Sequence, residues 1–311
     1  MTAKQILDRH AATLSGKLIH KRFASRALGA GKNFYVYEPP NLENQDKVHL
    51  LYLFRGHERE WVNMQEDGSR LRSTAIEDLD STIKSGMLPP TIAVLPGVTS
   101  SNNWVHSAGV NMSGEWDHHF SGLGSGRFYD YLTCELIPSI ERRYGPKRIA
   151  SKMAVGFSLG GYLVSLLTTK FPGYFTHAGI YDGTLMWANH HDPRIGKRSF
   201  NDKIWGKSFM FDASFGAPRV RRAMYEWNAT DRVIEANSRT LEAIRKTKFW
   251  VASASQDGGF GNRDRSKNFA EVLERAGIQN GFSEIPFHPD AAHSWHWTDR
   301  FLIEFLRRVL A

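Results

Sequence analysis

The sequence predicts an α/β protein with a mostly parallel central sheet and helices on both of its faces. Three observations indicate this class. Short apolar runs suited to buried strands recur along the chain, and stretches with the apolar spacing of helices lie between several of them. The chain has 311 residues, of which 41% are hydrophobic, so it can bury a sizeable core. Strands that alternate with helices are typical of a parallel sheet covered on both faces.

The predicted strands are short and rich in β-branched and aromatic residues, as buried strands usually are. In chain order they cover 33–39, 48–54, 91–97, 152–157, 177–182, 249–254 and 281–287. The predicted helices cover 71–85, 128–143, 159–170, 265–276 and 297–310, with a shorter amphipathic helix within the first 17 residues. In such a fold the binding crevice is expected at the carboxyl ends of the strands.

The segment from Gly183 to Thr247 is too long for a simple crossover between two strands. No Pro-, Gly- or Ser-rich linker separates it from the rest of the chain. We therefore expect one domain over 1–311. The segment 183–247 is expected to be an insertion beside the site, before the strand that carries the catalytic acid, and it could act as a lid.

Charge and composition argue against several function classes. The formal net charge is +8, but Lys and Arg are scattered without a long basic tract, so we expect no nucleic-acid partner. No apolar run reaches the roughly 18 residues that a membrane span needs, and the first residues do not resemble a signal peptide. These features favour a cytoplasmic protein without a membrane partner. No pattern indicates an oligomeric state.

The stretch AVGFSLGGYL, residues 154–163, contains the G-x-S-x-G pattern around Ser158. A predicted strand ends at Phe157 and a predicted helix follows at once, which is the strand–turn–helix context that this pattern requires of a nucleophile. Gly156 and Gly160 flank the turn, where larger side chains would collide. The helix N-terminus beside the serine favours developing negative charge. We therefore predict that Ser158 is a nucleophile and not a structural turn residue.

A serine nucleophile needs a base that an acid orients, and in this fold the chain order is Ser, then Asp or Glu, then His. Asp257 follows a predicted strand in the glycine-rich stretch SQDGGFGN, and we favour it as the acid. Asp182, at the end of an earlier strand, is the alternative. Either aspartate would enter the site from the carboxyl edge of the sheet.

The base is sought in FHPDAAHSWHW, which contains three histidines. His288 precedes a proline near a strand end, and His296 lies at the start of the last predicted helix. His293 lies in the loop between them, where its imidazole can reach both Ser158 and the acid, so we predict that His293 is the base.

The oxyanion of an acyl-transfer reaction needs two N–H donors. The backbone N–H of Leu159 is the first candidate, because it follows the nucleophile. The second is the N–H of His57 in LLYLFRGHEREW, where Gly56 permits a tight turn after a strand. Arg55 and Glu58 in the same loop are expected either to pair with each other or to contact substrate.

Aromatic residues are frequent in segments expected above the strand ends. Trp116, Trp187 and Trp295 are candidates to line a substrate pocket, although such residues also pack insertions onto a sheet. The histidine pairs in 116–120 and 188–193 lack the spacing of a helical zinc site. We therefore predict no metal and no cofactor.

Together these pieces resemble the Putative esterase family of α/β-hydrolases, which includes esterase D, enterochelin esterases, feruloyl esterase domains and mycolyltransferases. The resemblance covers about 15–310 and rests on segments in family order. They are LLYLFRGHEREW, FYDYLTCELIPSIERRY, MAVGFSLGGYLV, IWG, SASQDGGFGNRDRSKNFAEVLERAG and AHSWHWTDRFLIEFL. It implies that Ser158, Asp257 and His293 form the triad and that His57 and Leu159 form the oxyanion hole. Many members of the family have His directly before the glycine that precedes the oxyanion residue, whereas this chain has Arg55 before Gly56.

The sequence thus predicts a serine esterase that acts through an acyl-enzyme on a small, aromatic or sugar-bearing ester. Two alternatives stay open at this stage. The same triad could transfer the acyl group to an alcohol or sugar, or the fold could serve as a non-catalytic ligand-binding protein.

Overall fold

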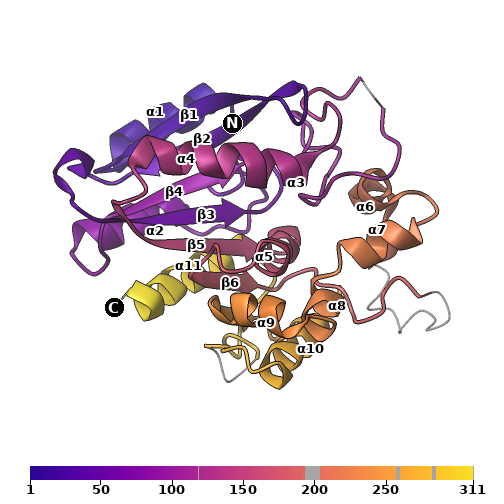
Figure 1. Cartoon of the computed structure of the whole chain (residues 1–311). Helices are drawn as coiled ribbons and strands as arrows, with labels where there is room; N and C mark the ends of the chain where they lie inside the picture. The colour runs from indigo at the N-terminus through magenta and orange to yellow at the C-terminus, as the bar shows by residue number, and fades with distance from the viewer. Residues whose placement is uncertain (118, 193–203, 257–259, 282–284, 311) are drawn as a thin grey trace.

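The computed structural model describes all residues except 118, 193–203, 257–259, 282–284 and 311. Its described part contains a seven-stranded sheet in the order β1-β2-β4-β3-β5-β6-β7 (Figure 1). The strands are β1 (Lys17–Ser25), β2 (Ala30–Glu38), β3 (Val48–Phe54), β4 (Thr91–Pro96), β5 (Ile149–Phe157), β6 (His177–Tyr181) and β7 (Lys248–Ala252). From β4 to β7 all neighbours are parallel, whereas β2 is antiparallel to both β1 and β4. The predicted fold class is confirmed.

Helices cover both faces of this sheet (Figure 1). They are α1 (Ala3–Thr13), α2 (Ala75–Lys84), α3 (Phe128–Asp130), α4 (Ile137–Tyr144), α5 (Leu159–Lys170), α6 (Ser208–Phe215), α7 (Arg221–Glu226), α8 (Ala229–Ile234), α9 (Ser238–Arg245), α10 (Asn262–Arg275) and α11 (Trp295–Leu310). A π-helical turn, Tyr131–Leu136, joins α3 to α4, and a 3-10 turn, Leu42–Asn44, precedes β3. No helix of the described residues is long and apolar enough to cross a membrane.

The alternation of side chains along β3 divides the core into two parts. Leu50, Tyr52 and Phe54 are buried in the cluster that contains α5 and α10. Leu51 and Leu53 are buried in the cluster that contains α1, α2 and α11. Successive side chains of a strand point to opposite faces, so a central strand with helices on both sides is apolar throughout. This accounts for the continuous apolar run that predicts β3.

Two parts of the sheet differ from the prediction. The apolar pattern of the sequence does not predict β1. Its residues are mostly half-exposed, because β1 is an edge strand that carries Lys and Arg. The described residues of 281–287 form no strand, and Asn280 makes only a single parallel bridge to Phe249. Gly281 lies directly against the Trp250 indole, and Pro286 has no N–H for a strand ladder.

The described part of the insertion is helical and packs on α5. Trp205 is buried, with its ring 4.3 Å from Phe211 and 5.4 Å from Tyr162 of α5. The Tyr162 hydroxyl donates to the carbonyl oxygen of Trp227 at 2.7 Å. The insertion thus packs on α5, the helix that follows Ser158, while its role as a lid stays a prediction.

A buried ion pair ties the chain after β3 to the start of α11. Arg70 Nε lies 3.0 Å from Asp299 Oδ2, and the two side chains are 1% and 5% exposed. The Arg70 guanidinium carbon lies 4.0 Å from the ring centre of Trp295, and its Nη1 donates to the carbonyl oxygen of Asn63. Burial raises the pKa of Asp299 to about 7. The pair therefore couples two segments that both lead into the candidate site.

We predict that Asp299→Ala destabilises the protein by about 3–5 kcal/mol, because it leaves the Arg70 charge buried without its partner. Urea unfolding of both proteins measures the difference. Asp46→Ala, which removes an exposed carboxylate, is the matched control and is expected to change stability by no more than about 0.5 kcal/mol. Equal stability of the Asp299→Ala and wild-type proteins would show that the pair ties nothing together.

Candidate active site

Ser158 lies at a strained turn between β5 and α5. Its φ is 54° and its ψ is −116°, a backbone conformation that non-glycine residues rarely adopt and that is typical of functional sites. A Cβ on Gly156 would overlap the Gly160 carbonyl, and a Cβ on Gly160 would overlap the end of β3 at Phe54. The glycines of the motif are therefore required for close backbone contact. The predicted strand–turn–helix context of Ser158 is present.

The chain after β6 is hydrogen-bonded to the turn at Ser158. The Ser158 N–H donates to the Tyr181 carbonyl oxygen at 3.1 Å, and the Thr184 N–H donates to the Ser158 carbonyl oxygen at 3.0 Å. Asp182 lies between these two residues, with a φ of 45°. Its side chain is thereby held at the carboxyl edge of the sheet, next to Ser158 in the fold.

Within the part of the chain that the structure describes, Asp182 is the carboxylate that contacts His293. His293 Nδ1 donates to Asp182 Oδ2 at 2.5 Å. The other carboxylate oxygen, Oδ1, accepts the Ala254 N–H at 3.0 Å, and the Asn262 side-chain amide contacts Oδ2 at 3.3 Å. Asp182 is 3% exposed, so these donors compensate for its loss of water. Asp257, the acid that the sequence favours, lies outside the described residues.

His293 is positioned by rings and by backbone hydrogen bonds. Its ring centre lies 4.6 Å from Phe157, the residue before the serine, and 5.4 Å from Phe260. The Tyr181 hydroxyl donates to the carbonyl oxygen of Ala292 at 2.7 Å. These contacts fix the loop that carries the imidazole against the ends of β5 and β6.

The two alternative histidines are engaged elsewhere. His288 stacks on Trp297 at 5.0 Å, and its Nδ1 accepts the Asp290 N–H. The backbone N–H of His296 donates to Ser69 in the segment after β3, and its ring packs against Trp297. The structure thus brings His293, and neither neighbour, onto a buried carboxylate.

In the turn after β3, the His57 N–H that is predicted to bind the oxyanion is already hydrogen-bonded to the Glu60 carboxylate. Glu60 Oε2 accepts the N–H of Gly56 at 2.7 Å and the N–H of His57 at 2.6 Å. Burial raises the pKa of Glu60. Leu159, the other predicted donor, opens α5, where the N–H groups of the first turn have no partner within the helix. The predicted His57 N–H donor is therefore already hydrogen-bonded to Glu60, whereas the Leu159 N–H has no partner within its helix.

The His57 side chain is structural in this arrangement. Its Nε2 lies 3.1 Å from the Ser101 carbonyl oxygen, and its Nδ1 lies 3.2 Å from Glu58. Burial lowers the pKa of His57 to about 4, so the ring is neutral at neutral pH. Glu58 is therefore paired with His57, and the expected pairing with Arg55 does not occur in this structure.

The three predicted tryptophans have different surroundings. Trp295 is only 2% exposed, with its ring 5.2 Å from Phe157 and 5.1 Å from Trp61. Trp295 is buried among aromatic side chains at the start of α11, and its contact with substrate stays a prediction. Trp116 and Trp187 are half-buried, and their contact with substrate stays a prediction.

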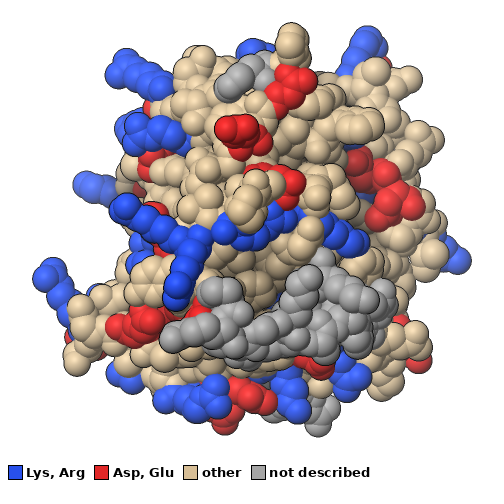
Figure 2. Space-filling view, turned by 90° about the vertical axis from the view of Figure 1, so that its right-hand side faces the viewer, with Lys and Arg blue, Asp and Glu red and all other residues tan. Residues whose placement is uncertain are grey.

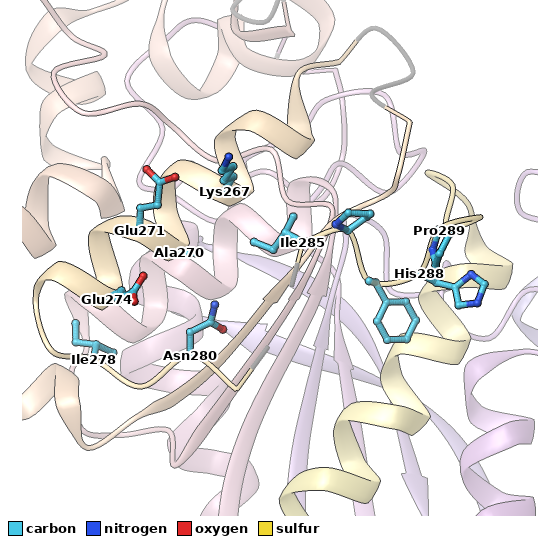
Figure 3. A pocket seen from close by; sticks show the side chains of 11 residues that line it. Lys267, Ala270, Glu271, Glu274, Ile278, Asn280, Ile285, His288 and Pro289 are labelled. Atoms are coloured by element: carbon cyan, nitrogen blue, oxygen red, sulfur yellow. The ribbon is translucent and has the colours of Figure 1, made fainter. Parts of the chain in front are cut away.

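A cavity of about 780 Å³ lies between α10 and the chain leading to His293 (Figure 3). Lys267, Glu271 and His288 are among its lining residues, whereas Ser158, Asp182 and His293 are not. We therefore do not assign the chemistry to it. Within the described ranges, no group of three or more His, Cys, Asp and Glu side chains is placed to hold a metal ion.

Comparison with solved structures shows which proteins share this fold. A ferulic acid esterase superposes with a TM-score of 0.65 at 18% identity, covering 95% of this chain and 98% of that one. An S-formylglutathione hydrolase from Agrobacterium tumefaciens gives 0.62 at 16% identity, with 96% and 97% covered. The fluorophosphonate-binding serine hydrolase F of Staphylococcus aureus gives 0.61 at 15% identity, with 94% and 98% covered.

These identities show the fold alone, which is that of the α/β-hydrolases. A comparison with curated proteins gives no significant match. The family model described as Putative esterase matches residues 25–308, which is most of the chain. The chain therefore belongs to this family of esterases.

Proposed function

We propose that the protein is a serine carboxylic-ester hydrolase that works through an acyl-enzyme on a small-molecule ester. Ser158 is the nucleophile, His293 the base and Asp182 the acid that orients His293. The observation that carries this proposal is the 2.5 Å hydrogen bond from His293 to a buried carboxylate, in a loop that packs against the strained serine turn. Family membership supports ester hydrolysis in general.

The chemistry follows from the tautomer that Asp182 selects. With Nδ1–H bound to the carboxylate, His293 keeps Nε2 as the acceptor for the Ser158 proton. Ser158 Oγ attacks the ester carbonyl carbon as Nε2 takes its proton, and the resulting imidazolium then protonates the leaving alcohol. Water repeats the sequence on the acyl-enzyme and releases the carboxylic acid.

We propose Asp182 in place of Asp257 because a buried carboxylate with three donors is already in position. The Ala254 N–H, the Asn262 amide and His293 Nδ1 all contact it. Both aspartates follow the serine and precede the histidine in the chain, so the order that the fold requires is met by either one. The direct contact of Asp182 with His293 supports this choice.

We predict that Ser158→Ala abolishes hydrolysis of 4-nitrophenyl acetate, with a loss of about 10⁶-fold. It is also expected to abolish labelling by a fluorophosphonate, because no oxygen is left to attack. Ser165→Ala, in the same helix about two turns further on, is the matched control and keeps both activities. Thermal unfolding checks that both variants are folded. Wild-type rates or labelling in Ser158→Ala would contradict the proposal.

The oxyanion is held by the Leu159 N–H and, we propose, by a His57 N–H that it shares with Glu60. One N–H can serve two acceptors at once. A charged carboxylate beside a developing oxyanion opposes it, however, because both are negative. Protonation of Glu60 removes this repulsion, and burial raises its pKa and so favours the protonated form.

Glu60→Gln tests this sharing, because glutamine keeps an acceptor oxygen but carries no charge. We predict that its kcat/KM exceeds the wild-type value by about 10-fold at a pH above the raised pKa of Glu60, where the wild-type carboxylate is ionised. The ratio of the two values falls towards one as pH decreases through the raised pKa of Glu60, since the wild-type enzyme then becomes neutral there too. Glu43→Gln, at an exposed position, controls for net charge. A ratio below one at a pH above the Glu60 pKa would contradict the shared donor.

A further inference from the structure

Arg55 is a cation near the reacting groups, and no acidic side chain of the described residues forms an ion pair with it. It follows the last residue of β3, and its Cα lies close to Gly160, two positions after the nucleophile. Its guanidinium carbon lies 5.2 Å from the ring centre of Phe157, and that ring lies 4.6 Å from His293. Arg55 is thus separated from the base by a single aromatic side chain.

The nearby acidic residues are committed to other groups. Glu58 lies 3.2 Å from His57, and Glu60 accepts the two backbone N–H groups of the turn. Among the described residues Arg55 makes no hydrogen bond and no ion pair, and its Nε atom is covered without a polar partner. A partly buried guanidinium has five donors in a planar fork, and its loss of water is best compensated by an anion.

Other positive charges reinforce this environment. Lys207 Nζ lies 5.1 Å from the ring centre of Phe260, which is itself 5.4 Å from His293. Arg55 and Lys207 therefore each pack against an aromatic ring, and both rings contact His293. Figure 2 shows Lys and Arg side chains in a row across the face at which β3 and β5 end. A positive field on this face would raise the local concentration of anionic substrates.

Neither the neutral His106 ring nor the two nearby carboxylates form an ion pair with Arg55. Burial, together with the positive charge of Arg55, lowers the pKa of His106 to about 4, so this ring is neutral at neutral pH. The Asp182 carboxylate is taken by His293 and by two further donors. Glu60 is the remaining nearby carboxylate, and its hydrogen bonds are with backbone N–H groups. Burial raises the pKa of Glu60, and the Arg55 charge opposes this rise without an ion-pair contact between the two side chains.

We propose that Arg55 determines specificity by binding a carboxylate on the ester substrate, so that the enzyme prefers esters with an anionic group near the scissile bond. The proposal rests on the proposed function and names the substrate class of the same site. The planar fork of arginine matches a carboxylate in a bidentate geometry that lysine cannot reproduce. The reaction itself is unchanged: Ser158 attacks, and the anionic group remains intact.

The test uses pairs of esters that differ only in charge. For an anion on the acyl side, 4-nitrophenyl hydrogen succinate is compared with the 4-nitrophenyl ester of succinamic acid. For an anion on the alcohol side, 4-acetoxybenzoate is compared with 4-acetoxybenzamide. We expect kcat/KM of the wild-type enzyme to favour the anionic member of one pair by roughly 10- to 100-fold, the size of a charge-assisted hydrogen bond. The pair that responds identifies the side.

The variants assign this preference to Arg55. Arg55→Gln is expected to reduce the ratio to about one, and Arg55→Lys to an intermediate value, because lysine keeps the charge but not the fork. Arg142→Gln removes an exposed charge from α4 and is expected to keep the wild-type ratio. Because the ratio compares two esters on one enzyme, a variant that is less active on both does not distort it.

Each outcome distinguishes this inference from the proposed function. A wild-type enzyme that hydrolyses both members of each pair equally overturns the role of Arg55 but leaves the esterase in place. A preference that persists in Arg55→Gln overturns it as well. A folded wild-type protein that neither hydrolyses any of the four esters nor reacts with a fluorophosphonate overturns the proposed function, and the inference with it.

Discussion

The candidate site depends on the hydrogen bond between Asp182 and His293. It joins the end of β6 to the loop before α11, segments more than a hundred positions apart in the chain. Asp182 is in turn held by Ala254 after β7 and by Asn262 at the start of α10. Three elements thus fix one carboxylate, and that carboxylate fixes the tautomer and orientation of His293, the proposed base. Without it, the strained serine turn would have no oriented acceptor for its proton.

The electrostatics of the site follow from how burial is compensated. The Asp182 carboxylate accepts three donors, and Glu60 accepts two backbone N–H groups, so both anions are stabilised locally. His57 is buried, and burial lowers its pKa to about 4, so its ring adds no charge to the turn after β3. Arg55 differs from these groups because among the described residues it makes no hydrogen bond and no ion pair; the Phe157 ring and the more distant Glu60 charge lie near it. That difference is why we assign it to the substrate.

The sequence predicts those features that depend on local patterns. The helix expected over 159–170 coincides with α5, because the G-x-S-x-G turn at Ser158 and the apolar run after it specify this helix directly. The same holds for the buried parallel strands. The edge strand β1 is not predicted, since its half-exposed residues lack the apolar run of a central strand.

Features that depend on contacts between distant segments are harder to predict. Asp182 and Asp257 both follow a strand at the same edge of the sheet and both lie between the serine and the histidine in sequence. The contact of Asp182 with His293 depends on Asn262 and Ala254, which belong to other elements. The engagement of the His57 N–H by Glu60 and the burial of Trp295 are tertiary in the same sense. A local motif carries no signal for such contacts.

The most direct test of this account is the comparison of Asp182→Asn with Asp257→Asn in kcat/KM for a 4-nitrophenyl ester. An asparagine at the orienting position keeps the shape but favours the wrong histidine tautomer, which costs about 10⁴-fold in a serine triad. The account predicts a loss of that size for Asp182→Asn and a change within about 10-fold for Asp257→Asn. The reverse result, with the large loss at Asp257, would contradict the role that we give to the Asp182–His293 hydrogen bond.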